Sequence, residues 1–95
     1  MSRARRVDNN HAEIASALRK VGAHVIDVHG LPGALDLLVA FRGALTLLEV
    51  KAHIKNPRLH LTDAESATID SLARCDVQAP VVTTVEQALR AIGCV

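Results

Sequence analysis

The segment that most constrains the fold is an apolar run, Leu37 to Leu48, with ionisable residues at both ends. Asp36 precedes this run, and Glu49 and Lys51 follow it. Leu and Val on either side of Arg42-Gly43 predict two strands, Leu37 to Phe41 and Leu45 to Val50, joined by a tight turn. Charged groups at the end of a buried hairpin are costly unless they are compensated. The sequence therefore predicts a hairpin whose open end holds a compensated charge cluster.

The register of this hairpin determines which side chains meet. With Arg42 and Gly43 as the two central residues of the turn, Asp36 is expected opposite Glu49. Because side chains alternate along a strand, Lys51 lies on the same face as Glu49, and Val50 points the other way. Two carboxylates directly opposite each other destabilise an ordinary sheet. Their convergence with a lysine indicates a site rather than a simple strand end.

Two carboxylates at one point are typical ligands of Mg²⁺, with water and substrate phosphate completing the shell. Such a cation polarises a phosphoryl oxygen and lowers the pKa of a bound water. Asp36 and Glu49 are the candidate ligands, and Lys51 can position the water or stabilise charge on the phosphate. The alternative is structural: Glu49 and Lys51 form a salt bridge at the rim, and Asp36 only begins a strand.

Short motifs accompany this cluster in a fixed order: Arg5-Arg6-Val7-Asp8, Glu13-Ile14, Gly30-Leu31-Pro32-Gly33, Asp36-Leu37-Leu38-Val39, Leu48-Glu49-Val50-Lys51, Leu61-Thr62 and Val85-Glu86-Gln87-Ala88-Leu89. Together they resemble the signature of the PD-(D/E)XK nucleases, and in particular the small stand-alone VRR-NUC branch of phages and bacteria. The resemblance extends from Arg5 to Gly93. One departure is Leu35, which stands where the signature has a proline before the aspartate.

The resemblance implies an α/β, restriction-endonuclease-like fold and Mg²⁺- or Mn²⁺-dependent hydrolysis of DNA phosphodiester bonds. It implies that Asp36, Glu49 and the Val50 carbonyl bind the metal, and that Glu13 approaches from the first helix. Stand-alone members look like homodimeric, structure-selective endonucleases, including Holliday-junction resolvases, so branched or duplex DNA is the expected substrate. A cytoplasmic location in a bacterium or phage-infected cell is the corresponding expectation.

Periodicity and caps predict the element order α-β-β-β-α-β-α, a mixed sheet flanked by helices. The first helix has an apolar stripe, but Asn10-x-x-Glu13 has capping-box spacing, so Glu13 can equally cap its own helix. Thr62-x-x-Glu65 predicts a second helix to about Arg74, in which Glu65 is structural. Its expected inward residues are Ile69, Leu72 and Ala73.

Positive charge is segregated although the formal net charge is only +1. Residues 1–7 form a basic arm that contains Arg5 and Arg6, and residues 8–95 form the expected single domain. The stretch that begins at Lys51 adds His53, Lys55 and Arg58 without a carboxylate before Asp63. Lysine and arginine side chains bind DNA phosphates without reading sequence. A solvated loop explains the same residues.

The composition excludes several other functions. No apolar run is long enough to span a bilayer, and we expect neither a membrane partner nor a small-molecule cofactor. Cys75 and Cys94 fit no metal or redox spacing. Phe41 is the only aromatic residue, which disfavours base stacking and weakens the hypothesis of an RNA phosphodiesterase. The remaining alternative to a nuclease is a non-catalytic DNA-binding or assembly module with the same fold.

Overall fold

The computed structural model describes residues 9–33, 35–52 and 55–95, which form three α-helices, four strands and a short 3-10 helix. In chain order these are α1 (Asn9–Lys20), β1 (His24–Asp27), β2 (Leu37–Phe41), β3 (Ala44–Val50), η1 (Pro57–His60), α2 (Asp63–Arg74), β4 (Val81–Val82) and α3 (Val85–Ala91). The chain is therefore an α/β domain, as the sequence predicted. No helix in the described ranges is long and apolar enough to cross a bilayer.

The four strands form one mixed sheet in the order β1-β2-β3-β4. Strands β1, β2 and β3 are antiparallel neighbours, whereas β4 pairs with β3 in parallel. A parallel neighbour requires a crossover connection, and the segment containing η1 and α2 provides it. The short β4 therefore lies beside the carboxyl end of β3, where Glu49 pairs with Val81.

The hairpin of β2 and β3 has the predicted register, with pairs from Phe41–Ala44 to Leu37–Leu48. Arg42 and Gly43 have φ values of 49° and 83°, so both central residues of the turn are left-handed. Turns with two left-handed residues match the twist of the flanking strands. The Arg42 guanidinium lies 4.7 Å from the centre of the Phe41 ring, a cation–π contact that favours this arginine conformation.

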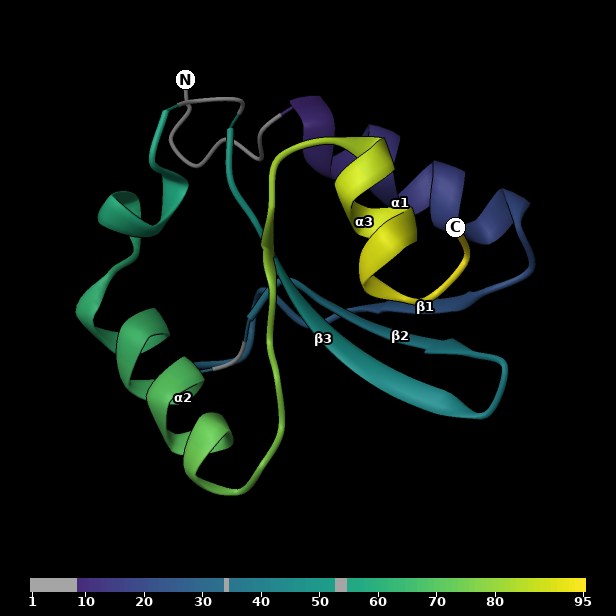
Figure 1. Cartoon of the computed structure of the whole chain (residues 1–95). Coiled ribbons are helices and arrows are strands. Elements are labelled where there is room, and N and C mark those ends of the chain that lie inside the picture. Colours follow the sequence, from purple (N-terminus) through teal and green to yellow (C-terminus); the bar gives the residue numbers. More distant parts are fainter. Residues whose placement is uncertain (1–8, 34, 53–54) are drawn as a thin grey trace.

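Helices α1 and α3 cover one face of the sheet and lie side by side, as Figure 1 shows. The core between these helices and the strands is apolar and includes Ile14, Leu18, Val25, Leu37, Val39, Leu48, Val50, Val82, Ala88 and Ile92. Within β3, Leu48 and Val50 point into this core. Residues 49 and 51 consequently point to the opposite face, because strand side chains alternate.

Helix α2 lies apart from the other two helices (Figure 1), and none of its residues is fully buried. Ile69 and Leu72 are partly buried, but Ala73 is exposed, so the prediction that Ala73 faces inward was wrong. The polar contacts of α2 with the rest of the domain lie in its first half, where Glu65 meets Lys51 and the Thr68 hydroxyl donates to the Gly33 carbonyl. The last turn of α2 extends beyond these contacts.

Replacing Gly43 with alanine tests the turn. A Cβ at position 43 has open space around it, so the only cost is the left-handed backbone. We expect Gly43→Ala to lower the free energy of unfolding by about 1 kcal/mol in urea denaturation. Gly30→Ala is the matched control, because Gly30 also has open space but is not left-handed. An equal loss in both variants would contradict the turn geometry.

Candidate functional site

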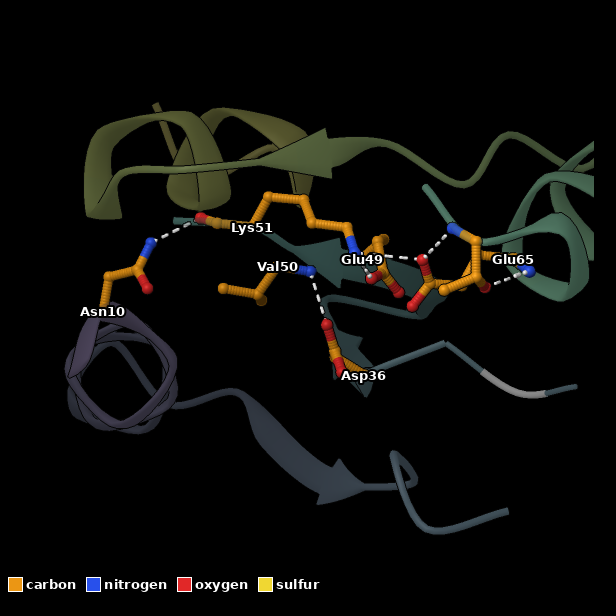
Figure 2. Close-up of polar contacts among 7 residues, drawn as sticks. Asn10, Asp36, Glu49, Val50, Lys51 and Glu65 are labelled. Atoms are coloured by element: carbon orange, nitrogen blue, oxygen red, sulfur yellow. Dashed lines mark hydrogen bonds and ion pairs between the residues drawn. The ribbon is translucent and has the colours of Figure 1, made fainter. Parts of the chain in front are cut away.

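The candidate site lies at the end of β3, on the face of the sheet that points away from α1 and α3 and towards helix α2 (Figure 2). Glu49 and Lys51 point to this face, and the Lys51 ammonium Nζ lies 3.3 Å from Glu49 Oε2. The same ammonium donates to Glu65 Oε1 at 3.0 Å. Glu49 and Lys51, two residues apart in the chain, are thus joined to the carboxylate of Glu65 on helix α2.

Asp36 joins the site from the start of β2, but not in the way that the register predicted. The strand ladder ends at the pair Leu37–Leu48, so Asp36 does not pair directly with Glu49. The Asp36 backbone N–H donates instead to the Leu48 carbonyl at 3.1 Å. The Asp36 side chain then accepts a hydrogen bond from the Val50 N–H through Oδ2 at 2.8 Å (Figure 2). A carboxylate therefore replaces the next backbone acceptor at the end of the hairpin.

The Val50 carbonyl points to the same side of β3 as Asp36. In an extended strand, the N–H and C=O of one residue point to the same side. Since the Val50 N–H points to Asp36, its carbonyl oxygen lies on that side of β3 as well. The predicted ligands Asp36 and Val50 are thus on one side of the strand end, and Asp36 is close enough for its charge to act on the Glu49 carboxyl.

Glu65 was interpreted from the sequence as a structural capping residue, and it has that role. The Thr62 hydroxyl accepts from the Glu65 N–H, and Glu65 Oε1 accepts from the Thr62 N–H at 2.8 Å. The same Oε1 also accepts from Lys51, so Glu65 belongs to the site as well. The capping motif predicted the position of Glu65 along the helix. Its contact with Lys51 depends on the packing of α2, which no local pattern reports.

Glu49 is the most unusual group in the site. The residue is only 1% exposed, and its Oε1 has no hydrogen-bond partner among the described residues. Burial raises the pKa of the Glu49 carboxyl to about 8, and a hydrogen bond to Glu65 and the negative charges of Asp36 and Glu65 act in the same direction. Lys51 opposes this rise without cancelling it. Near neutral pH, Glu49 is therefore largely protonated when no other cation is bound.

The two partners of Glu49 are ionised. Burial raises the pKa of the Glu65 carboxyl, but hydrogen bonds from the Thr62 backbone, Glu49 and Lys51 outweigh it and lower the value. Burial lowers the pKa of the Lys51 ammonium, but the hydrogen bond to Glu65 and the charge of Glu49 raise it above its ordinary value. Lys51 is thus a fixed positive charge and is not available as a proton acceptor.

These side chains fit a divalent cation. The Lys51 ammonium contacts two carboxyl groups, those of Glu49 and Glu65, and the charge of Asp36 also acts on Glu49, so acidic groups outnumber basic ones in the site. The Glu49 oxygen without a partner is an acceptor that a cation would satisfy. All the available donors are oxygen atoms, which suits Mg²⁺ or Mn²⁺.

Helix α1 contacts the end of β3 through the side chain of Asn10, which does not cap the helix. Helix α1 begins at Asn9, so Asn10 lies inside the helix and is not the N-cap residue that the sequence suggested. Its side-chain amide donates to the Lys51 carbonyl at 2.6 Å (Figure 2). The same amide donates to the Thr83 carbonyl at 2.9 Å. Glu13 is exposed on the same helix, and its proposed approach to the metal stays a prediction.

The predicted DNA-binding residues have different positions. Lys55 and Arg58 are exposed just before and within η1, in the segment that follows β3. Lys51 is engaged with the two glutamates and is largely covered. Arg5, Arg6 and His53 lie outside the described residues.

Comparison with known proteins adds no assignment, because the chain matches no family model, no curated protein and no solved structure.

The raised pKa of Glu49 predicts a specific pH dependence of stability. The folded state keeps the Glu49 proton up to about pH 8, whereas the unfolded chain releases it near pH 4.5. Stability therefore falls as the pH rises between these values, by at most about 1.4 kcal/mol per pH unit for one group. We expect urea denaturation in EDTA to show this loss between pH 6 and pH 8, and Glu49→Gln to reduce it. Mg²⁺ should stabilise the wild type more at pH 8 than at pH 6.

The matched control for this measurement is Glu86→Gln. Glu86 is an exposed glutamate on α3 that pairs with Arg90, so its variant should keep the pH dependence of the wild type. The same dependence in Glu49→Gln and in the wild type would contradict the assignment of the buried proton to Glu49.

Proposed function

We propose that this chain is a metal-dependent DNA endonuclease of the PD-(D/E)XK type, with Asp36, Glu49 and Lys51 as its catalytic residues. The observation that carries the proposal is the convergence of Asp36, Glu49 and a fully charged Lys51 at one strand end, with a buried carboxylate oxygen that has no partner. A rim salt bridge does not require a glutamate that is buried among two other carboxylates.

We further propose that the fold is restriction-endonuclease-like. The elements follow one another as α1, β1, β2, β3, α2, β4 and α3, which is compatible with a restriction-endonuclease-like arrangement. In that arrangement the aspartate begins one strand of a hairpin and the glutamate and lysine end the other.

Asp36, Glu49 and the Val50 carbonyl would hold Mg²⁺ or Mn²⁺. Such an ion supplies Lewis-acid polarisation of the scissile phosphate and a lowered pKa for the attacking water. Glu49 has to lose its proton to act as a ligand, so its raised pKa makes cation binding favour higher pH.

Lys51 has a role that follows from its charge. Its ammonium is held by Glu49 and Glu65 and therefore has a defined position without substrate. A preorganised positive charge stabilises the negative charge that develops on a phosphoryl group. Because its pKa is raised, Lys51 acts in this way rather than as a general base.

The preferred substrate is proposed to be branched DNA, such as a Holliday junction, cut by a homodimer. One active site hydrolyses one strand, and a two-fold dimer supplies the second site that a junction or duplex requires. Exposed Lys55 and Arg58 follow the catalytic strand and add positive charge for the DNA backbone.

Cleavage assays test the proposed chemistry. We expect the full chain to cut junction, flap, nicked or linear DNA with Mg²⁺ or Mn²⁺, and to be inactive in EDTA. Asp36→Asn, Glu49→Gln and Lys51→Ala should each lower the cleavage rate at least about 100-fold, whereas Glu86→Gln should not. Cleavage that survives EDTA, or that Lys51→Ala leaves unchanged, would refute the mechanism. Tight DNA binding without cleavage under either metal would favour the non-catalytic module.

Salt-dependent binding tests the basic segment separately. If Lys55 and Arg58 contact phosphates, each alanine variant should weaken binding to all DNA sequences alike and reduce the slope of log K against log salt by about 1. Lys20→Ala is the control, because Lys20 is exposed at the far end of α1, about 15 Å along the helix from Asn10. An unchanged slope in the Lys55 and Arg58 variants would remove this segment from the interface.

A further inference from the structure

A second cluster of ligand-type side chains lies where the beginning of α1 meets the end of β1. His11 is in the first turn of α1, Asp27 is the last residue of β1, and His29 follows two residues later. Asp27 is on the same face of β1 as buried Val25, because strand side chains alternate. This is the face that α1 covers, and it brings Asp27 towards His11.

The three side chains lie close enough together to share one metal ion. One ligand atom from each residue lies within 4.8 Å of the other two. His11 Nε2 is 3.8 Å from Asp27 Oδ2, and His29 Nδ1 contacts the other oxygen of Asp27. The two imidazole rings are 5.8 Å apart, edge to face. Ligands on a tetrahedral zinc ion are about 3.4 Å apart at the usual bond lengths, so small side-chain rotations suffice.

The burial of His11 without a hydrogen-bond partner is not explained by local structure, whereas the position of His29 is. His29 donates its backbone N–H to Asp27 Oδ1 at 3.1 Å, which is an ordinary turn interaction between neighbours. The His11 side chain is only 10% exposed, and its Nε2 has no hydrogen-bond partner among the described residues. A buried polar nitrogen without a partner is costly. It faces the Asp27 carboxylate at a distance too long for a hydrogen bond.

We propose that His11, Asp27 and His29 bind a divalent transition-metal ion of the Zn²⁺ type. Two imidazole nitrogens and one carboxylate oxygen suit zinc or its neighbours, not magnesium. The Asp27 and His29 side chains are 44% and 41% exposed, so the ion can enter and water can complete its shell. This site shares no residue with the Asp36–Glu49–Lys51 cluster and does not depend on the proposed nuclease activity.

Occupation of the site would tie helix α1 to the connection that leads into β2. Val28, between the two exposed ligands, donates its N–H to the Asp36 carbonyl at 2.9 Å. The backbone that carries Asp36 is therefore bonded to the segment that the ion would hold. The expected role is structural, with the thermal stability of the chain increasing with the metal concentration.

Isothermal titration calorimetry of the full chain with Zn²⁺, after treatment with a chelator, tests the proposal. We expect one tight equivalent that His29→Ala weakens at least tenfold, and a thermal midpoint that rises with Zn²⁺ in the wild type but much less in His29→Ala. His24→Ala removes an exposed histidine from the same strand and should keep the wild-type affinity. Cys75→Ser/Cys94→Ser should also keep it, which excludes binding by the two free thiols. Glu49→Gln should keep it as well, because the ligand sets are separate.

The decisive variant is His29→Ala, because an exposed side chain can be removed without disturbing the core. His11→Gln provides a second test if circular dichroism shows that it folds. The visible absorption of bound Co²⁺ reports the histidine and carboxylate ligands directly. Equal zinc affinity in His29→Ala and in the wild type, or an equal loss in His24→Ala, would overturn the proposal.

Discussion

A glutamate at the buried end of β3 requires compensation, and the arrangement around it follows from that requirement. Glu49 is almost completely covered, and Asp36 and Glu65 add negative charge nearby. Lys51 provides the one positive charge in contact with it among the described residues. The remaining excess is carried by a proton on Glu49. A proton and a divalent cation compete for the same oxygen atoms, so the feature that makes the metal-free site costly also makes it receptive to a metal.

The sheet and helices give this cluster its geometry. Alternation along β3 sends Leu48 and Val50 into the core under α1 and α3, which places Glu49 and Lys51 on the other face. The hairpin ladder ends at Leu37, the residue next to Asp36, and the Asp36 side chain accepts the Val50 N–H in place of a backbone acceptor. Asn10 ties α1 to the Lys51 carbonyl. Core packing on one face thus positions charged groups on the other.

The two candidate metal sites differ in chemistry. The first consists of oxygen ligands beside an ammonium group and suits a hard cation such as Mg²⁺. The second has two imidazoles and one carboxylate at the junction of α1 and β1 and suits a softer ion. Asp36 and Val28 are joined by a backbone hydrogen bond, so both candidate sites adjoin the same connection between β1 and β2.

The sequence alone determined the features that depend on local pattern. Strand alternation and the Arg42-Gly43 turn were sufficient for the register of β2 and β3, and the Thr62 capping box located the start of α2. Only the tertiary structure decided which distant groups meet. The sequence predicted Glu65 as a capping residue but not as a partner of Lys51. It predicted Asn10 as a cap, whereas Asn10 bonds to the Lys51 carbonyl just after β3. Turns, strand alternation and capping boxes arise from backbone geometry over a few residues, so the sequence shows them. The contacts of Glu65 and Asn10 depend on how whole helices pack, which no spacing of a few residues encodes.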